Sequence, residues 1–314
     1  MVDKYISVEK KRNYYERLII PYKAKEQTRF FIEQYINGDG KELSKNFWNV
    51  KSSSRMAFDL YSWIAKCPIV IDFSFEYKLP GLKSGGNGPN MDVFIETEDE
   101  IIFIESKFSE KANLNYKNGH LPKAYYSEEP YGEKLWSLYQ RYYDYELICN
   151  EIIKFINDVD EFLTGMPQKD RNCEWFYPKQ ETCHLIGIIF MLLGIGDKHI
   201  QQSILHIQQS ILHVQQSILK GKELKFYNVF WKFDDDKEDS YLAEFFKSRA
   251  LELFDKIPEF NNVKFIYETL TVQDLLSNKK QISKNIVFND EIKLLMNPYF
   301  EVAKNQTRMS MQKK

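Results

Sequence analysis

The amino-acid sequence predicts an α/β fold in which helices flank a central sheet. Two strand-like runs, 91–97 and 101–108, are separated only by an acidic turn at 98–100, which is the pattern of a β-hairpin. Farther along the chain, strand-like runs at 224–233 and 263–270 enclose a helical run at 241–257. Such alternation of strands and helices is typical of an α/β sheet.

The composition is that of a globular protein. With 314 residues, 43% of them hydrophobic, the chain can bury a large core. No apolar stretch reaches the roughly 18 residues that a membrane span requires, and residues 1–15 lack the apolar segment of a signal peptide. We therefore expect a soluble, cytoplasmic protein. The net charge of -2 gives no global attraction to nucleic acid, so any such binding must use local basic patches.

The elements before the hairpin follow from local patterns. Residues 1–43 are predicted to form a mixed-charge helical segment. Serines at 52–54 precede a helical apolar period, as expected of a capped helix. The run 69–79 is a strand in which aromatic and polar residues alternate. The alternating aromatic residues are Phe73, Phe75 and Tyr77.

The elements after the hairpin are mainly helical. The tyrosines of 111–147 could stack on nucleobases, but their helix-compatible spacing favours packing. An amphipathic helix is predicted at 143–163, and a buried helix at 184–195 that ends in glycines. The tail at 304–314 is polar and basic and is expected to fray.

Residues 199–219 contain three copies of one heptad, HIQQSIL, with a single Ile-to-Val change. Isoleucine and valine recur in alternating steps of four and three residues, as in the seam of a coiled coil. The stretch has no Asp, Glu, Lys or Arg, so the flanking charges that usually select a coiled-coil partner are absent. We expect an inserted helix that protrudes or packs back on the domain, with a homodimer contact as the alternative.

Charged residues end the second strand of the hairpin, although an apolar run normally excludes them. An unpaired buried ion costs several kcal/mol, so Glu105 and Lys107 need compensation. Side chains two residues apart project from the same face of a strand, and hairpin pairing brings Asp92 alongside them. Carboxylate oxygens are the ligands that Mg²⁺ prefers, and water and phosphate oxygens complete its octahedron. The pattern therefore favours a Mg²⁺ site over an ion pair at a sheet end.

The tripeptide Glu-x-Lys is not specific by itself, because the chain contains five copies. They begin at Glu9, Glu76, Glu105, Glu223 and Glu291. Only the copy at Glu105 follows an unbroken apolar run and has an Asp at the start of the preceding strand. The copy at Glu76 lies on the strand expected beside the hairpin, so Glu76 is a further candidate for the same site.

The segment PNMDVFIETEDEIIFIESKF resembles the motif of the PD-(D/E)xK nuclease superfamily, in which an Asp and a Glu-x-Lys lie on a hairpin of a small mixed sheet flanked by helices. Together with SSSRMAFDLYSWI and FEYKLP, it is similar to a branch of restriction endonucleases over residues 44–110. The resemblance implies that Asp92 and Glu105 are Mg²⁺ ligands, that the Ser106 backbone carbonyl is a further ligand, and that Lys107 positions or activates the attacking water. Glu76 would be an additional catalytic acid near the metal.

The resemblance also implies a helix after the catalytic strand that often carries a Gln, for which His184 is the nearest counterpart identified in the sequence. It implies a restriction-endonuclease-like mixed central sheet. The near-identity of the heptad copies indicates that the heptad-repeat helix is inserted into this domain. We expect an N-terminal helical segment at 1–43, a nuclease-like domain at 44–280 with the insertion at 199–220, and a helical and polar tail at 281–314.

The expected activity is Mg²⁺-dependent hydrolysis of phosphodiester bonds, with Mn²⁺ as a substitute metal and DNA as the expected nucleic acid. Two alternatives belong to other functional classes. One is a catalytically inactive relative that binds nucleic acid without metal chemistry. The other is an assembly protein that uses the heptad helix and for which the hairpin is only scaffold.

Overall fold

A five-stranded mixed sheet forms the centre of the computed structural model, which describes residues 34–35, 47, 51–80, 88–108, 145–167, 176–194, 213–218, 220–233 and 241–311. The strand order is β1-β2-β3-β4-β5. The bounds are Val70–Lys78 for β1, Asn90–Thr97 for β2, Glu100–Lys107 for β3, Glu223–Phe230 for β4 and Phe265–Thr271 for β5. β1 pairs antiparallel with β2, and β2 pairs antiparallel with β3, whereas β4 and β5 continue parallel to β3. The predicted hairpin and the α/β fold class are confirmed.

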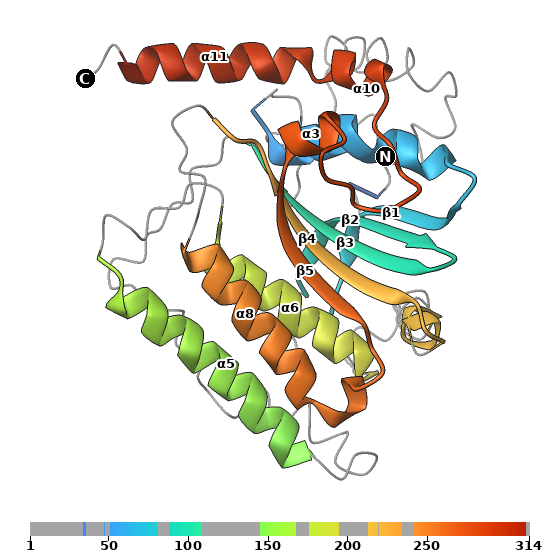
Figure 1. The fold of residues 1–314 in the computed structure, drawn as a ribbon, viewed down its shortest axis with the longest axis vertical. Coiled ribbons are helices and arrows are strands. Elements are labelled where there is room, and N and C mark those ends of the chain that lie inside the picture. The colour runs from blue at the N-terminus through green and yellow to red at the C-terminus, as the bar shows by residue number, and fades with distance from the viewer. Residues whose placement is uncertain are drawn as a thin grey trace.

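Helices cover both faces of this sheet (Figure 1). On one face lie α5 (Tyr145–Gly165), α6 (Pro178–Leu192) and α8 (Tyr241–Lys256). On the other lie α3 (Ser53–Tyr61), α10 (Asp290–Leu295) and α11 (Asn297–Met311). The short elements are η3 (Ser62–Lys66), η5 (Pro258–Phe260) and α9 (Val272–Leu276). None of the helices in the described ranges is long and apolar enough to cross a membrane.

Strand β3 is an apolar run because both of its faces are covered. Ile101 and Phe103 belong to the core cluster on the α6 side, whereas Ile102 and Ile104 belong to the cluster on the α3 side. Continued alternation places Glu105 on the face that α6 covers. The charged end of the strand therefore meets a helix rather than solvent.

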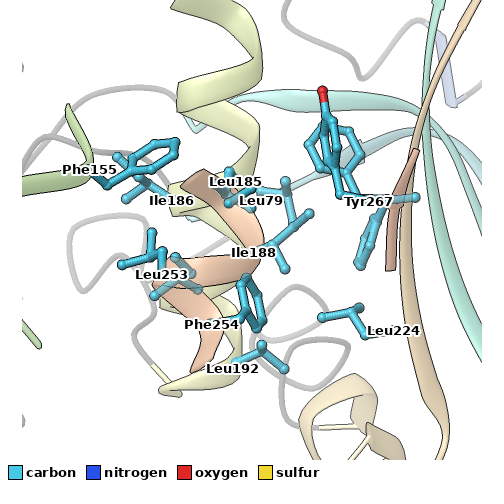
Figure 2. Packing of buried hydrophobic residues seen from close by; sticks show 14 of the residues in the cluster. Leu79, Phe155, Leu185, Ile186, Ile188, Leu192, Leu224, Leu253, Phe254 and Tyr267 are labelled. Atoms are coloured by element: carbon cyan, nitrogen blue, oxygen red, sulfur yellow. The ribbon is translucent and has the colours of Figure 1, made fainter. Parts of the chain in front are cut away.

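Helix α6 is held over the sheet by close apolar packing (Figure 2). Its inward residues include Leu185, Ile188 and Leu192, which are at most 6% exposed. Leu224 of β4 and Tyr267 of β5 lie across from them in the same cluster. This packing fixes the helix, and its first turn with it, relative to the ends of the strands.

Helix α3 is tied to the end of β3. Ser52 caps the helix, because its side chain accepts a hydrogen bond from the backbone N–H of Arg55, which confirms the predicted capped helix. The next serine, Ser53, accepts a 3.0 Å hydrogen bond from the backbone N–H of Phe108. The start of α3 and the residue that follows Lys107 are therefore fixed together.

Strand β1 departs from the alternation that its sequence predicts. Phe73 and Phe75 lie in the cluster on the α3 side, but Tyr77 packs against the opposite cluster and stacks on Phe94 at 4.3 Å between ring centroids. Glu76, which lies between them, has a φ of 52°, in the left-handed region that few non-glycine residues adopt. The change of backbone direction at Glu76 explains why the third aromatic ring turns to the other face.

The described part of the heptad region, 213–218, packs on the domain. Val214 and Ile218 are each 1% exposed and belong to the core cluster on the α6 side. Ser217 donates a hydrogen bond to Glu96 at the far end of β2, and His213 contacts the same carboxylate. The back-packed arrangement therefore holds for residues 213–218, while residues 199–212 and 219 lie outside the described residues.

Two further predictions concern the ends of the chain. The tail was expected to fray from 304, but α11 continues as a helix to Met311. This helix begins at Asn297, so the polar residues of the tail extend an existing helix rather than start a separate segment. Of the predicted helical segment at 1–43, all but 34–35 lies outside the described residues, as does the tyrosine-rich stretch 111–144.

Candidate active site at the end of the central hairpin

Pairing between β2 and β3 brings two of the predicted acids together. Val93 is paired with Ile104, so Asp92 lies across from Glu105 at the next position of the antiparallel ladder. The backbone N–H of Ser106 donates a 2.7 Å hydrogen bond to Oδ2 of Asp92. Asp92 is therefore anchored at the carboxyl end of β3.

Glu105 and Lys107 meet on one face of β3, as their spacing predicts. The Nζ of Lys107 lies 2.5 Å from Oε1 of Glu105, and the two side chains are 11% and 1% exposed. A charge-assisted contact of this length in a buried setting is strong. It holds an ammonium beside the two carboxylates without removing it from solvent entirely.

A third strand contributes an acid at the edge of this group. Glu76 of β1 lies opposite Asp92, because Phe75 pairs with Val93 and Tyr77 pairs with Met91. Its Oε2 accepts a 3.3 Å hydrogen bond from the Nδ2 of Asn90. The charge of Glu76 also raises the pKa of Asp92. Glu76 therefore acts on the site through its field, and a hydrogen bond holds it on the neighbouring strand.

The pKa of Asp92 lies well above its usual range. Burial is the largest cause, and the nearby charge of Glu105 adds to it. Lys107 and the hydrogen bond from Ser106 act in the opposite direction but do not cancel the shift. Two carboxylates this close stabilise each other only when a proton or a cation lies between them.

Helix α6 supplies a site residue that the sequence did not identify. The Nε2 of Gln180 donates a 2.6 Å hydrogen bond to Oε1 of Glu105. The predicted helix began at 184, whereas α6 begins at Pro178, so its polar first turn was left out. The signal was available, because proline is favoured in the first turn of a helix.

Glu181, next along α6, is a buried acid with a complete set of partners. Its Oε1 accepts a 2.7 Å hydrogen bond from Nδ2 of Asn228, and its Oε2 accepts a 2.9 Å hydrogen bond from the hydroxyl of Tyr267. Burial, followed by the charge of Glu105, raises the pKa of Glu181 to about 8. The raised pKa favours the protonated form of this side chain over the ionised form below about pH 8.

His184 lies one turn farther along α6, behind Glu105. Its Nδ1 is 3.6 Å from Oε2 of Glu105, and the two side chains are 2% and 1% exposed. Burial lowers the pKa of His184 more strongly than the charge of Glu105 raises it. Neither His184 Nδ1 nor Glu105 Oε2 has a hydrogen-bond partner among the described residues.

The donor set fits a divalent cation that takes few ligands from the protein. Asp92 and Glu105 provide two carboxylates, and Oε2 of Glu105 is a buried acceptor without a protein donor. Mg²⁺ is commonly held by one or two carboxylates plus water and phosphate oxygens. Within the described ranges, no group of three or more His, Cys, Asp or Glu side chains is arranged to hold a metal ion. A closed, all-protein metal cage is therefore not what this arrangement offers.

The geometry thus joins Asp92, Glu105 and Lys107, with Glu76 beside them, and adds Gln180, Glu181 and His184 from α6. Comparison of the chain with protein-family models, with curated proteins and with solved structures finds no match.

Proposed function

We propose that this chain is a Mg²⁺-dependent endonuclease of the PD-(D/E)xK type, with a restriction-endonuclease-like sheet and DNA as its substrate. The observation that carries the proposal is the environment of Glu105. This carboxylate is 1% exposed, is held by Lys107 and Gln180 through Oε1, and lies across the hairpin from Asp92. A structural ion pair at a sheet end would need none of the surrounding acids.

Asp92, Glu105 and the backbone carbonyl of Ser106 would hold the metal, with Mn²⁺ as a substitute for Mg²⁺. When bound, such an ion neutralises charge on a scissile phosphate and lowers the pKa of water. The chain does the remaining work. Lys107 places a positive charge where negative charge develops during attack on phosphorus, and it can orient the attacking water.

The residues around Glu105 serve to fix its direction. Gln180 and Lys107 both donate to Oε1, so this oxygen cannot rotate freely. Oε2 is left for a cation. Because the carboxylate is buried, its interactions act in a medium of low dielectric and are stronger than they would be in water.

The proposal is tested by nicking of supercoiled plasmid with Mg²⁺, Mn²⁺ or EDTA. Wild type is compared with Asp92→Asn, Glu105→Gln and Lys107→Ala. We expect metal-dependent cutting that falls by about 100-fold or more in each variant. The matched control is Lys293→Ala, since Lys293 also ends a Glu-x-Lys but lies on α10 in an ion pair with the exposed Asp290.

The competing function is a catalytically inactive relative that binds nucleic acid, because Lys107 already neutralises Glu105 without a metal. Lack of cutting of duplex DNA, single-stranded DNA and RNA, with every variant folded by circular dichroism, would favour that alternative. Cutting that persists in Glu105→Gln and Lys107→Ala would place the active site elsewhere. Restriction-type activity would cut both strands and so convert the supercoiled plasmid to linear DNA.

A further inference from the structure

Two buried acceptor atoms face each other, and one of them is an oxygen of Glu105, the proposed metal-binding carboxylate. His184 Nδ1 and Glu105 Oε2 lie 3.6 Å apart, on α6 and β3. Each side chain is at least nine-tenths buried, and neither atom has a hydrogen-bond partner in the described part of the chain. Lys107 and Gln180 both donate to the other oxygen of Glu105, so neither donates a hydrogen bond to Oε2 of Glu105.

The position of the proton on the His184 ring explains why two acceptor atoms face each other. The ring has a hydrogen bond with the backbone of Asn90, and we assign it to Nε2 because Nδ1 has no hydrogen-bond partner among the described residues. With the proton on Nε2, Nδ1 presents a lone pair toward a carboxylate oxygen. Two buried acceptors in contact cost free energy unless a positive centre lies between them.

The separation suits a metal ion held by both atoms. Nitrogen and oxygen ligands lie about 2.1 Å from a small divalent ion, so two ligands at a right angle are about 3.0 Å apart and two opposite ligands about 4.2 Å apart. The observed 3.6 Å falls between these limits. Asn228, the partner of Glu105 on β4, adds a further buried side-chain oxygen without a hydrogen-bond partner among the described residues.

We propose that His184 Nδ1 and Glu105 Oε2 form a nitrogen–oxygen binding position for a first-row transition-metal dication. The inference rests on the proposed function in one respect, namely that Glu105 is a metal ligand. It goes beyond that function by adding an imidazole ligand, which the carboxylate pair alone does not have. Imidazole is a better ligand for later transition-metal dications such as Co²⁺ and Zn²⁺ than for Mg²⁺ and Ca²⁺, which prefer oxygen ligands.

The ring also provides a matched pair of variants. In His184→Gln the amide reaches as far as Nε2, so the contact with the Asn90 backbone is kept while the Nδ1 ligand is lost. In His184→Asn the amide reaches only as far as Nδ1, so an oxygen can replace the nitrogen ligand. His213→Gln is the control, since His213 is 57% exposed and lies with Glu96 at the opposite end of β2.

The test is electron paramagnetic resonance of bound Mn²⁺, with detection of ¹⁴N coupling, together with calorimetric titration by Mn²⁺, Co²⁺ and Mg²⁺. We expect ¹⁴N coupling in wild type and His213→Gln, and none in His184→Gln or His184→Asn. Loss of a ligand should weaken Co²⁺ binding by at least about tenfold in His184→Gln and change Mg²⁺ binding less. If His184→Gln does not fold, His184→Asn alone tests the proposal. This variant should then bind Mn²⁺ without ¹⁴N coupling.

The outcomes separate this inference from the proposed function. Nitrogen coupling that depends on His184, in a protein that cuts no nucleic acid, supports the metal position and removes the nuclease function. Bound Mn²⁺ without ¹⁴N coupling in wild type, or coupling that persists in His184→Gln, overturns the metal position while leaving the nuclease open. Failure of wild type to bind any of these metals overturns the inference and the metal chemistry of the proposed function together.

Discussion

Gln180 donates a 2.6 Å hydrogen bond to Oε1 of Glu105, so helix α6 and strand β3 meet at one carboxylate oxygen. The two residues are 75 positions apart in the chain. Lys107 donates to the same oxygen from within β3. The local hairpin therefore supplies the charges, and a distant helix fixes the direction in which one of them points.

Replacement of Gln180 by Ala should weaken metal binding without unfolding the protein. The loss of this donor leaves Lys107 as the only donor to Oε1 of Glu105 among the described residues, so the carboxylate can rotate. We expect metal affinity to fall by about 10- to 100-fold, as is usual when a partner of a metal ligand is removed. Titration of the metal by calorimetry measures this loss.

Lys179→Ala on the same turn is the control for Gln180→Ala. It shortens a neighbouring side chain but leaves the contact with Glu105 intact. Equal affinity in Gln180→Ala and Lys179→Ala would show that the hydrogen bond has no role in metal binding.

Glu181 should make the protein less stable as the pH rises from about 4.5 to about 8. Its pKa is raised from 4.5 to about 8 in the folded chain, so over this range the folded state holds a proton that the unfolded state has released. Stability then decreases with pH, by at most about 1.4 kcal/mol per pH unit. Glu181→Gln keeps a neutral side chain at every pH and should not show this component.

The measurement is urea unfolding with EDTA at pH 5, 6, 7 and 8. Wild type and Glu181→Gln should have similar free energies of unfolding at pH 5, and the variant should become the more stable of the two toward pH 8. Glu161→Gln, which changes an exposed carboxylate on α5, should follow wild type. Parallel curves for wild type and Glu181→Gln would mean that Glu181 is already ionised at neutral pH.

The hairpin could be predicted from sequence because its determinants are local. The apolar run of β3, the turn at 98–100 and the i, i+2 spacing of Glu105 and Lys107 together fix which charges meet. The contribution of α6 could not be predicted in the same way. Its residues reach Glu105 only after the helix has packed on the sheet, and no local pattern specifies that docking.

The hydrogen bonds of Glu181 were even harder to predict from sequence. Asn228 and Tyr267 lie on two different strands, and each was recognisable as part of a strand. Their common contact depends on the parallel register of β3, β4 and β5, which sequence alone leaves open. Similarly, nothing in the run 69–79 marks Glu76 as the residue with a positive φ that turns Tyr77 to the other face.

Glu96 should matter for stability and not for metal binding. Glu96 is a buried carboxylate near the end of β2 that is farther from Asp92. It accepts hydrogen bonds from Lys222 and Ser217 at 2.7 and 3.0 Å. Glu96→Gln leaves the ammonium of Lys222 without its carboxylate, so we expect a loss of about 1–3 kcal/mol in the free energy of unfolding. Urea unfolding and metal titration of the same variant check both parts.

His213→Ala provides the contrast for Glu96→Gln. His213 contacts Glu96 but is 57% exposed, so its removal should change stability by less than about 1 kcal/mol. Weaker metal binding in Glu96→Gln, at unchanged secondary structure, would mean that the two ends of β2 are coupled.

Metal binding itself should strengthen as the pH rises. The pKa of Asp92 is raised, first by burial and then by Glu105, so below this raised pKa the metal-free site holds a proton that a metal ion must displace. Below that raised pKa, apparent affinity for Mg²⁺ or Mn²⁺ should increase by up to about tenfold per pH unit and then level off. Asp92→Asn removes the proton and should bind more weakly with little pH dependence, whereas Glu181→Gln should keep the slope. Calorimetric titrations from pH 5.5 to 8.5, in buffers with different heats of ionisation, report both the affinity and the number of protons released. Affinity that is independent of pH in wild type would mean that Asp92 is ionised before the metal binds, and that Lys107 balances the site alone.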